Sequence, residues 1–231
     1  FNYLTKLYSD NGTIINIETS AFYTKFIDKV FIDYETDPNK IIYDNINGYA
    51  TSTGVSSNLD FSFKNGLKVI AGVTWMDVEN VENNQKSRPF FVEKFTGTFA
   101  VSYKIEKLNL NFDYTGNVYS PMKLPLLGEL DPRSPYSPWF SIQNIQLTFS
   151  GWRNFELYGG IKNLLNFTPK QNNPYLIART NDPFDQNVQY DSDGNVQATP
   201  DNPYAATFDT AYVYTQNQGI RGFWGLRYTL K

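Results

Sequence analysis

The chain contains neither cysteine nor histidine. The lack of Cys excludes disulfides, thiolate metal sites and Cys nucleophiles. The lack of His excludes Ser-His-Asp triads, His general bases and His-liganded zinc or iron. No run of about 18 apolar residues occurs, and such a run is what a transmembrane helix needs. Several catalytic classes are therefore ruled out, and we expect no enzyme activity and no cofactor.

Charge is also sparse and nearly balanced. The 231 residues carry 20 Lys and Arg against 23 Asp and Glu, a formal net charge of −3. Because a phosphate-backbone binder needs a basic surface, we expect no nucleic-acid partner. Aromatic residues are abundant, with 17 Tyr and 18 Phe, although the mean hydropathy is only −0.45. That combination favours sheets with one apolar and one polar face.

Apolar and polar residues alternate along most of the chain. Between residues 108 and 118, Leu, Phe, Tyr and Val occupy alternate positions, with Asn, Asp and Thr between them. The pattern recurs in 55–63, 95–103, 145–149 and 224–230, and it indicates half-buried antiparallel strands. We expect about nine strands, near residues 1–8, 13–32, 46–63, 67–79, 90–104, 107–119, 137–150, 155–165 and 210–230.

Short and long connections alternate between these strands. Asn11-Gly12 and Asn65-Gly66 favour tight hairpins, because both residue types tolerate positive φ. Further short turns are expected at 105–107 and 151–154, and long connections at 33–45, 80–89, 120–136 and 166–207. A loop of about 40 residues is unusual in a compact soluble domain. Short periplasmic turns and long extracellular loops are typical of an antiparallel transmembrane β-barrel, and this is the fold class that we predict.

Side chains on the two strand faces support the same interpretation. Aromatic residues beside the short turns are typical of an interfacial girdle: Phe63, Tyr103, Phe149, Trp152, Phe155 and Tyr228. A charged side chain on the lipid face costs roughly 2–4 kcal/mol for Arg or Lys, so alternation assigns charges to the lumen. The lumen-facing candidates, which either contact a plug or lie solvated, are Glu18, Asp60, Lys94, Asp113, Glu156, Lys162 and Arg227.

Three segments resemble TonB-dependent outer-membrane receptors. They are SAFYTKFID at 20–28, ELYGGIKNLLN at 156–166 and GIRGFWGLRYTL at 219–230. The resemblance implies that residues 1–231 form the C-terminal portion of the barrel, about the last nine of 22 strands, with the plug domain and early strands outside it. The odd strand number agrees, since complete bacterial barrels have an even count. The ending Leu230-Lys231 departs from the aromatic terminus common in the family.

The resemblance also implies a function. Such receptors bind an extracellular iron chelate, cobalamin or oligosaccharide and import it with TonB-derived energy. Expected partners are outer-membrane lipid, the receptor's own N-terminal plug domain and the TonB complex, with a surface lipoprotein lid as a further candidate. Two alternatives remain open: a soluble or surface-attached β-sandwich that binds glycan, and a passive porin.

Loop residues supply the ligand candidates. Aromatic and Arg side chains on exposed loops suit ligand capture as a group, and packing over neighbouring residues is the alternative for any single one. The candidates are Arg133, Tyr136, Tyr175, Phe184, Tyr190 and Tyr204. The segment DSDGN at 191–195 partly resembles a calcium loop, but Gln189 stands where its first Asp belongs and Pro200 where its Glu belongs. We interpret it as a hairpin tip and predict no metal site. A loop calcium held by Asp182, Asp185 and Asp191 is the alternative.

Overall fold

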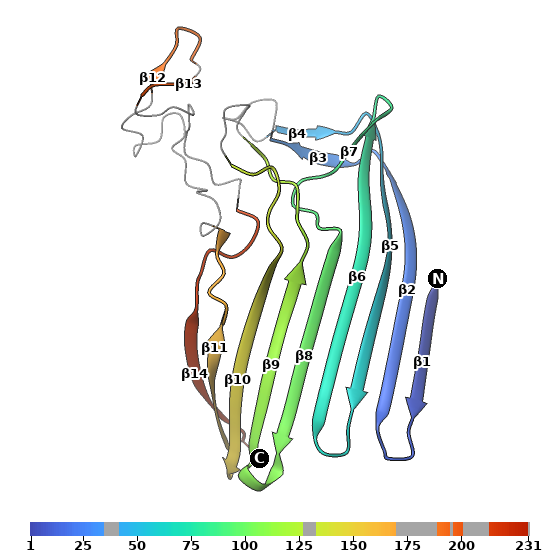
Figure 1. Cartoon of the computed structure of the whole chain (residues 1–231), viewed down its shortest axis with the longest axis vertical. Coiled ribbons are helices and arrows are strands. Elements are labelled where there is room, and N and C mark those ends of the chain that lie inside the picture. The colour runs from blue at the N-terminus through green and yellow to red at the C-terminus, as the bar shows by residue number, and fades with distance from the viewer. Residues whose placement is uncertain (35–41, 127–132, 170–188, 195, 201–212, 231) are drawn as a thin grey trace.

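One antiparallel sheet organises the molecule (Figure 1). The computed structural model describes all residues except 35–41, 127–132, 170–188, 195, 201–212 and 231. Nine strands are hydrogen-bonded in sequence order, and β7 (Gln85–Ser87) pairs with β6 beside them. The nine are β1 (Asn2–Tyr8), β2 (Ile14–Ile27), β5 (Gly48–Ser62), β6 (Leu67–Glu82), β8 (Phe95–Ile105), β9 (Leu110–Tyr119), β10 (Phe140–Trp152), β11 (Phe155–Lys162) and β14 (Arg221–Tyr228). The predicted all-β antiparallel class is confirmed. Among the described strands, β1 and β14 do not pair with each other, so the sheet is open.

The register keeps one set of side chains on each face across the whole sheet. Asp60 pairs with Ile70, Ile70 with Ala100 and Ala100 with Thr115. Residues in register share a face, so this row and its neighbours two residues away form a polar face rich in Asn, Asp, Ser and Thr. The intervening row, which includes Leu59 and Ala71, forms an apolar face. In the described part of the chain, no helix is long and apolar enough to cross a membrane.

The tight turns lie at one end of the sheet and differ in type from the expected ones. Gly12 and Gly66 have positive φ of 81° and 85°, whereas the asparagines before them do not. The Gly12 N–H donates to the Ser9 carbonyl over 2.8 Å, which fits a type I turn followed by a left-handed glycine. The two-residue turn with positive φ at both positions is Asn83-Asn84, between β6 and β7. The connection 80–89 is therefore largely a hairpin rather than a plain loop.

Several predicted strand ends were wrong, and left-handed residues explain some of them. Asp28, with φ of 59°, ends β2 inside the predicted strand 13–32. The chain then forms a small hairpin of β3 (Val30–Asp33) and β4 (Ile42–Asn45), and β4 lies where a plain connection was expected. Asn109, with φ of 51°, ends a 3-10 turn over Glu106–Leu108, so β9 starts after it. The last strand starts at Arg221, well after the predicted residue 210.

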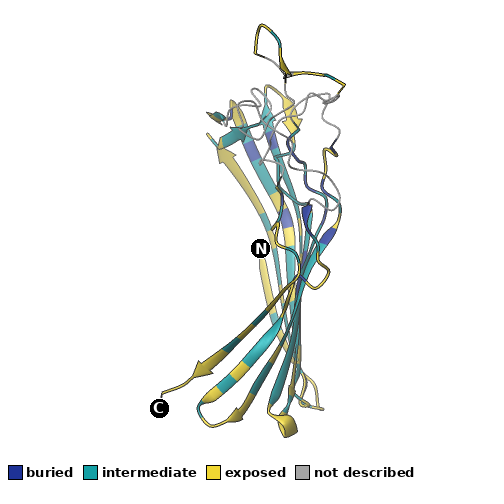
Figure 2. Cartoon of the chain, turned by 90° about the vertical axis from the view of Figure 1, so that its left-hand side faces the viewer, coloured by how far each residue is buried: buried dark blue, intermediate teal, exposed yellow. Residues whose placement is uncertain are grey.

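Burial is low because a single sheet layer leaves both faces open. On the apolar face, Trp75, Leu147 and Leu226 are 51%, 51% and 55% exposed. The buried apolar cluster instead consists of Met122, Leu124, Phe140 and Tyr214. By register Phe140 belongs to the polar face, so this cluster covers that face near the long loops, where Figure 2 shows the buried residues. The exposed apolar face therefore needs an apolar partner such as lipid.

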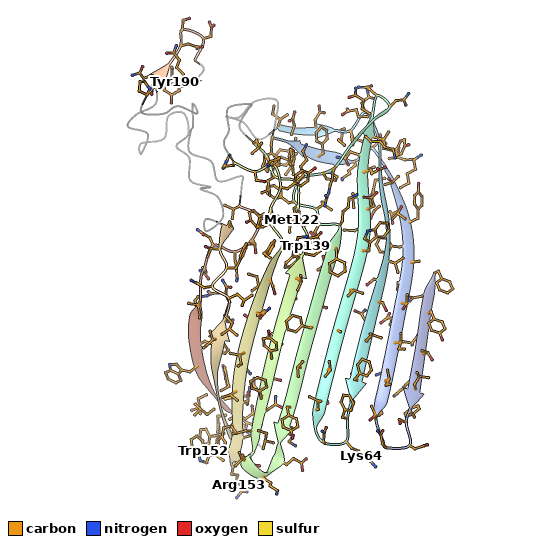
Figure 3. The ribbon with its side chains drawn as sticks, in the orientation of Figure 1. Lys64, Met122, Trp139, Trp152, Arg153 and Tyr190 are labelled. Atoms are coloured by element: carbon orange, nitrogen blue, oxygen red, sulfur yellow. The ribbon has the colours of Figure 1, made fainter. Side chains whose placement is uncertain are left out.

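Aromatic side chains mark two levels on the apolar face. Near the short turns, the predicted girdle residues pack together: Trp152 contacts Phe149 and Phe155 contacts Tyr228, with ring centroids 5.2 and 4.7 Å apart. Figure 3 shows Trp152 at that end and Trp139 towards the long loops. Trp139 packs against Phe95 at 5.8 Å. Trp139 and Phe149 lie ten residues apart, which is about 33 Å along the strand and roughly 25 Å along the membrane normal at a tilt of about 40°. This spacing matches the ~25 Å apolar band of outer-membrane barrels.

A new charge at the same height should destabilise the protein much more on the apolar face than on the polar face. We expect Ala71→Arg, on the apolar face between Leu59 and Phe99, to destabilise the protein in vesicles by about 2–4 kcal/mol. The matched control Ile70→Arg lies on the polar face opposite Asp60 and should change stability by less than about 1 kcal/mol. Urea unfolding of the intact protein in lipid vesicles measures both. Equal losses would contradict the assignment of the faces.

Candidate functional site

Charged side chains on the polar face form the first part of the candidate site. By register, six of the seven predicted lumen residues share this face, namely Glu18, Asp60, Asp113, Glu156, Lys162 and Arg227. The seventh, Lys94, precedes β8 and forms an ion pair with Asp77 at 2.6 Å. That this face lines a lumen and contacts a plug stays a prediction.

The strands β11 and β14 carry a regular ladder on that face. Glu156 accepts a hydrogen bond from Arg227 over 2.7 Å, and the two residues are cross-strand partners. The Arg227 guanidinium lies 5.8 Å from the centre of the Tyr158 ring, and Tyr158 packs over Gly225, which has no side chain of its own. This charge is therefore neutralised inside the sheet.

A buried asparagine joins the ends of β11 and β14. Asn163 is fully buried, with a left-handed backbone at φ of 52°. Its side-chain amide donates to the carbonyls of Phe167 and Gln218 over 2.7 and 3.0 Å, and its side-chain oxygen accepts from the Phe167 N–H over 3.0 Å. The Asn166 oxygen accepts from the Ile220 N–H over 2.8 Å. The KNLLN segment thus positions the chain that leads into β14, a role that strand alternation alone did not reveal.

The predicted ligand residues of the loops do not form one cluster. Tyr136 and Tyr190 are exposed, at 44% and 38%, and Figure 3 shows Tyr190 in the outer hairpin of β12 (Gln189–Tyr190) and β13 (Val196–Gln197). Arg133 is only 3% exposed, so its side chain packs against its neighbours, which is the alternative expected for a single loop residue. Tyr175, Phe184 and Tyr204 lie outside the described residues. Ligand contact by these residues stays a prediction.

The segment at Asp191 forms a hairpin tip. The Asp191 side chain accepts from the Asp193 N–H over 2.9 Å, and its carbonyl accepts from the Gly194 N–H over 3.1 Å. Gly194 has a positive φ of 85°, as such a turn requires. Within the described ranges no cluster of three or more acidic residues is able to hold a metal. Asp182 and Asp185 lie outside those ranges.

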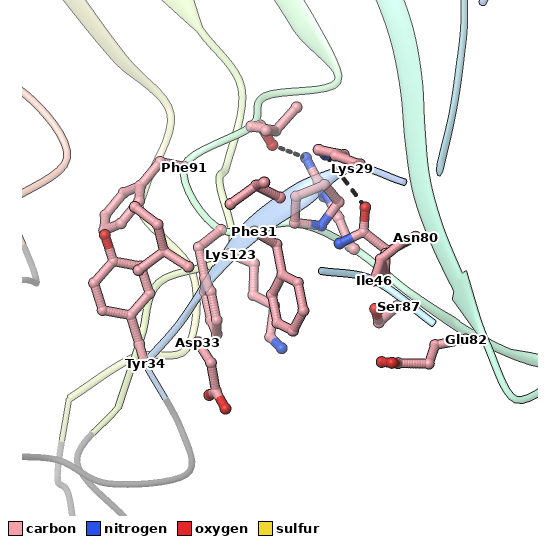
Figure 4. Close-up of a pocket in the computed structure, with 16 residues that line it drawn as sticks. Lys29, Phe31, Asp33, Tyr34, Ile46, Asn80, Glu82, Ser87, Phe91 and Lys123 are labelled. Carbon is pink, nitrogen blue, oxygen red and sulfur yellow. Dashed lines mark hydrogen bonds between the residues drawn. The ribbon is translucent and has the colours of Figure 1, made fainter. Parts of the chain in front are cut away.

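A pocket that the sequence did not indicate lies at the long-loop end (Figure 4). It has a volume of about 360 Å³ and lies between β3, β7 and the segment after β7. Lys29 donates to the Asn80 side chain over 3.3 Å, Arg88 donates to the carbonyls of Val92 and Pro121, and the Lys123 ammonium lies 4.4 Å from the centre of the Phe90 ring. The pocket thus combines cationic and aromatic side chains.

At the long-loop end, a neighbouring carboxylate also raises the pKa of one lysine, Lys86. Lys86 of β7 forms an ion pair with Glu79 at 2.6 Å. The hydrogen bond and charge of that carboxylate raise the pKa of the Lys86 ammonium above its ordinary value. The pair is solvent-exposed, so it adds little to stability.

Together, the open sheet, its exposed apolar band and its polar inner row define the wall of a membrane-spanning β-barrel. The model of the TonB dependent receptor-like β-barrel family matches residues 4–164. The chain therefore belongs to the TonB-dependent receptor family, which comprises transport receptors rather than enzymes, and its place is the outer membrane.

Solved structures agree on the fold. The ferric-catecholate import receptor Fiu from E. coli K12 has a TM-score of 0.57 at 11% identity, covering 99% of this chain and 27% of the receptor. The siderophore receptor PirA from Acinetobacter baumannii has a TM-score of 0.57 at 11% identity, covering 98% of this chain and 31% of the receptor. The FrpB iron transporter from Neisseria meningitidis has a TM-score of 0.54 at 11% identity, covering 98% of this chain and 29% of the transporter. The chain thus spans less than a third of each. The curated proteins give no match.

The Asn163 contacts predict different effects for the same chemical change at two sites. Asn163→Asp removes two donated hydrogen bonds and leaves the carbonyls of Phe167 and Gln218 unpaired, so we expect a loss of about 2–4 kcal/mol. Asn166 accepts the Ile220 N–H through its side-chain oxygen, which an Asp retains, so Asn166→Asp should cost less than about 1 kcal/mol. Thermal unfolding, with hydrogen exchange of the Ile220 amide, measures both. A larger loss at Asn166 would contradict the role of Asn163.

Proposed function

We propose that the receptor containing this chain binds an iron chelate outside the cell and imports it across the outer membrane with TonB-derived energy. The observation that carries the proposal is family membership over residues 4–164. The sheet supports it, because its polar face offers a wet inner wall and its apolar face a lipid contact. The similar structures are a ferric-catecholate import receptor, a siderophore receptor and an iron transporter, which favours iron chelates over cobalamin or oligosaccharide.

The partners follow from the same proposal. An N-terminal plug would fill the lumen against the polar face, and the TonB complex would act on that plug. The wall itself performs no bond chemistry, so we propose that the chain is not an enzyme. A surface lipoprotein lid would close over the long loops, where the exposed hairpin β12–β13 projects furthest (Figure 1).

Energy dependence separates this function from passive diffusion. We expect uptake of a radiolabelled iron chelate by cells that produce the intact receptor, and we expect loss of that uptake when TonB is deleted. The energy-independent behaviour of a porin would leave uptake unchanged in the deletion strain. A panel of catecholate, hydroxamate and citrate chelates, with cobalamin and maltooligosaccharides as controls, identifies the solute. Uptake without TonB would contradict the proposal.

We expect a deletion in the long loops to lower the affinity for the chelate without lowering the stability of the barrel. Deleting the hairpin from Gln189 to Gln197 removes two short strands that pair with each other in a sheet separate from the main one. We therefore expect chelate affinity to fall by about tenfold or more, while the free energy of unfolding changes by less than about 1 kcal/mol. Binding to detergent-solubilised receptor and urea unfolding provide the two measurements. Reduced stability with unchanged affinity would contradict a capture role for this loop.

A further inference from the structure

A depression on the polar face lies above the ladder of β11 and β14. It has a volume of about 530 Å³ and includes side chains from β9, β10, β11 and β14. Two cations, Lys162 and Arg221, line it together with one carboxylate, that of Asp113. The amides Asn144, Gln146 and Gln216 complete its polar lining. The depression is separate from the pocket of Figure 4, which lies between β3 and β7.

The two cations are direct cross-strand partners. Lys162 pairs with Arg221 in the register of β11 and β14, and like charges in that arrangement destabilise a sheet. Among the described residues, neither forms an ion pair with a carboxylate. Three rungs below, the same two strands place Glu156 opposite Arg227 and form an ion pair of 2.7 Å. The upper pair thus places two positive charges side by side, whereas in the lower pair Glu156 neutralises Arg227.

Local packing holds both cations at the depression. The Lys162 ammonium lies 5.3 Å from the centre of the Phe223 ring. That ring lies across Gly160, where a Cβ atom would approach it to 2.9 Å. Arg221 donates to the side-chain oxygen of Gln218, whose carbonyl is bound by the buried Asn163. The cations are therefore oriented by their neighbours, and an anion that binds there meets a partly preorganised site.

We propose that this depression binds a carboxylate group between the Lys162 ammonium and the Arg221 guanidinium. A guanidinium matches the two oxygens of a carboxylate in a planar fork. With two cations and the Asp113 carboxylate, the site has a net charge of +1. That positive charge attracts a carboxylate anion. The carboxylate belongs either to a solute or to another part of the receptor chain, and the second source rests on the proposed plug.

The test measures how fast an acetylating reagent modifies Lys162 in the intact receptor, purified from outer membranes in detergent, with peptide mass spectrometry as the readout. Citrate is the soluble carboxylate probe. If the site is open to solutes, we expect citrate to slow acetylation of Lys162 by about tenfold. Lys68, which lies on the same face opposite Ser62 and Ser102, is the internal control and should not respond.

A second arm identifies a carboxylate supplied by the receptor itself. Carbodiimide joins an amine to an adjacent carboxylate, so an occupied site yields a cross-link from Lys162 to an Asp or Glu elsewhere in the receptor. Arg221→Gln should weaken citrate protection or cross-linking by about tenfold. The matched control Arg227→Gln removes a cation that already has Glu156 as its partner, and it should leave both signals unchanged.

Each outcome decides the proposal. Citrate protection assigns the site to a solute, and a cross-link assigns it to the receptor's own chain. Lys162 that is neither protected nor cross-linked overturns the proposal, as does an equal response of Lys68. Iron uptake is measured separately on the same variants, so uptake that persists with an empty site would leave the transport function standing. A filled site in a receptor that does not import iron would leave the carboxylate site standing.

Discussion

Backbone hydrogen bonding in a lipid environment is the constraint on which the rest of this structure depends. An N–H or C=O group left unpaired in hydrocarbon costs several kcal/mol, so strands that cross a membrane must pair along their length. The register accordingly runs without a shift through β5 and β6, from Gly48 opposite Glu82 to Ser62 opposite Lys68. A shift occurs in β10 between Phe149 and Trp152, at the short-turn end, where water and headgroups satisfy free polar groups.

Continuous register has a second consequence, because it fixes which side chains share a face. Above the shift at the short-turn end of β10, the register separates a polar row from an apolar row across the nine strands. Lipid then takes the place that a second layer holds in a soluble sandwich, which explains why residues such as Leu147 and Leu226 stay half exposed. The apolar cluster around Phe140 lies on the polar face only where the long connections fold back over it.

Side chains on the polar face of β11 and β14 are held in place by packing and hydrogen bonds, which a wall that only faces water would not need. On β11 and β14, glycines stand beside aromatic rings: Tyr158 packs over Gly225 and Phe223 across Gly160. These rings support cations, and the buried Asn163 anchors the chain that enters β14. One cation, Arg227, has a carboxylate partner within the sheet. The others at this edge are left to interact with whatever occupies the space beside the polar face.

The sequence by itself determined the strand alternation, the two faces, the contrast of short turns with long connections, and the family. These follow from local rules, since a period of two and tight turn residues act over a few neighbouring positions. Only the tertiary structure decided the hairpin at Asn83-Asn84, the inward burial of Arg133 and the meeting of Lys162 with Arg221. Lys162 and Arg221 are separated by the whole connection between β11 and β14. The register of two strands brings them together, and no local pattern specifies a register across a connection of that length.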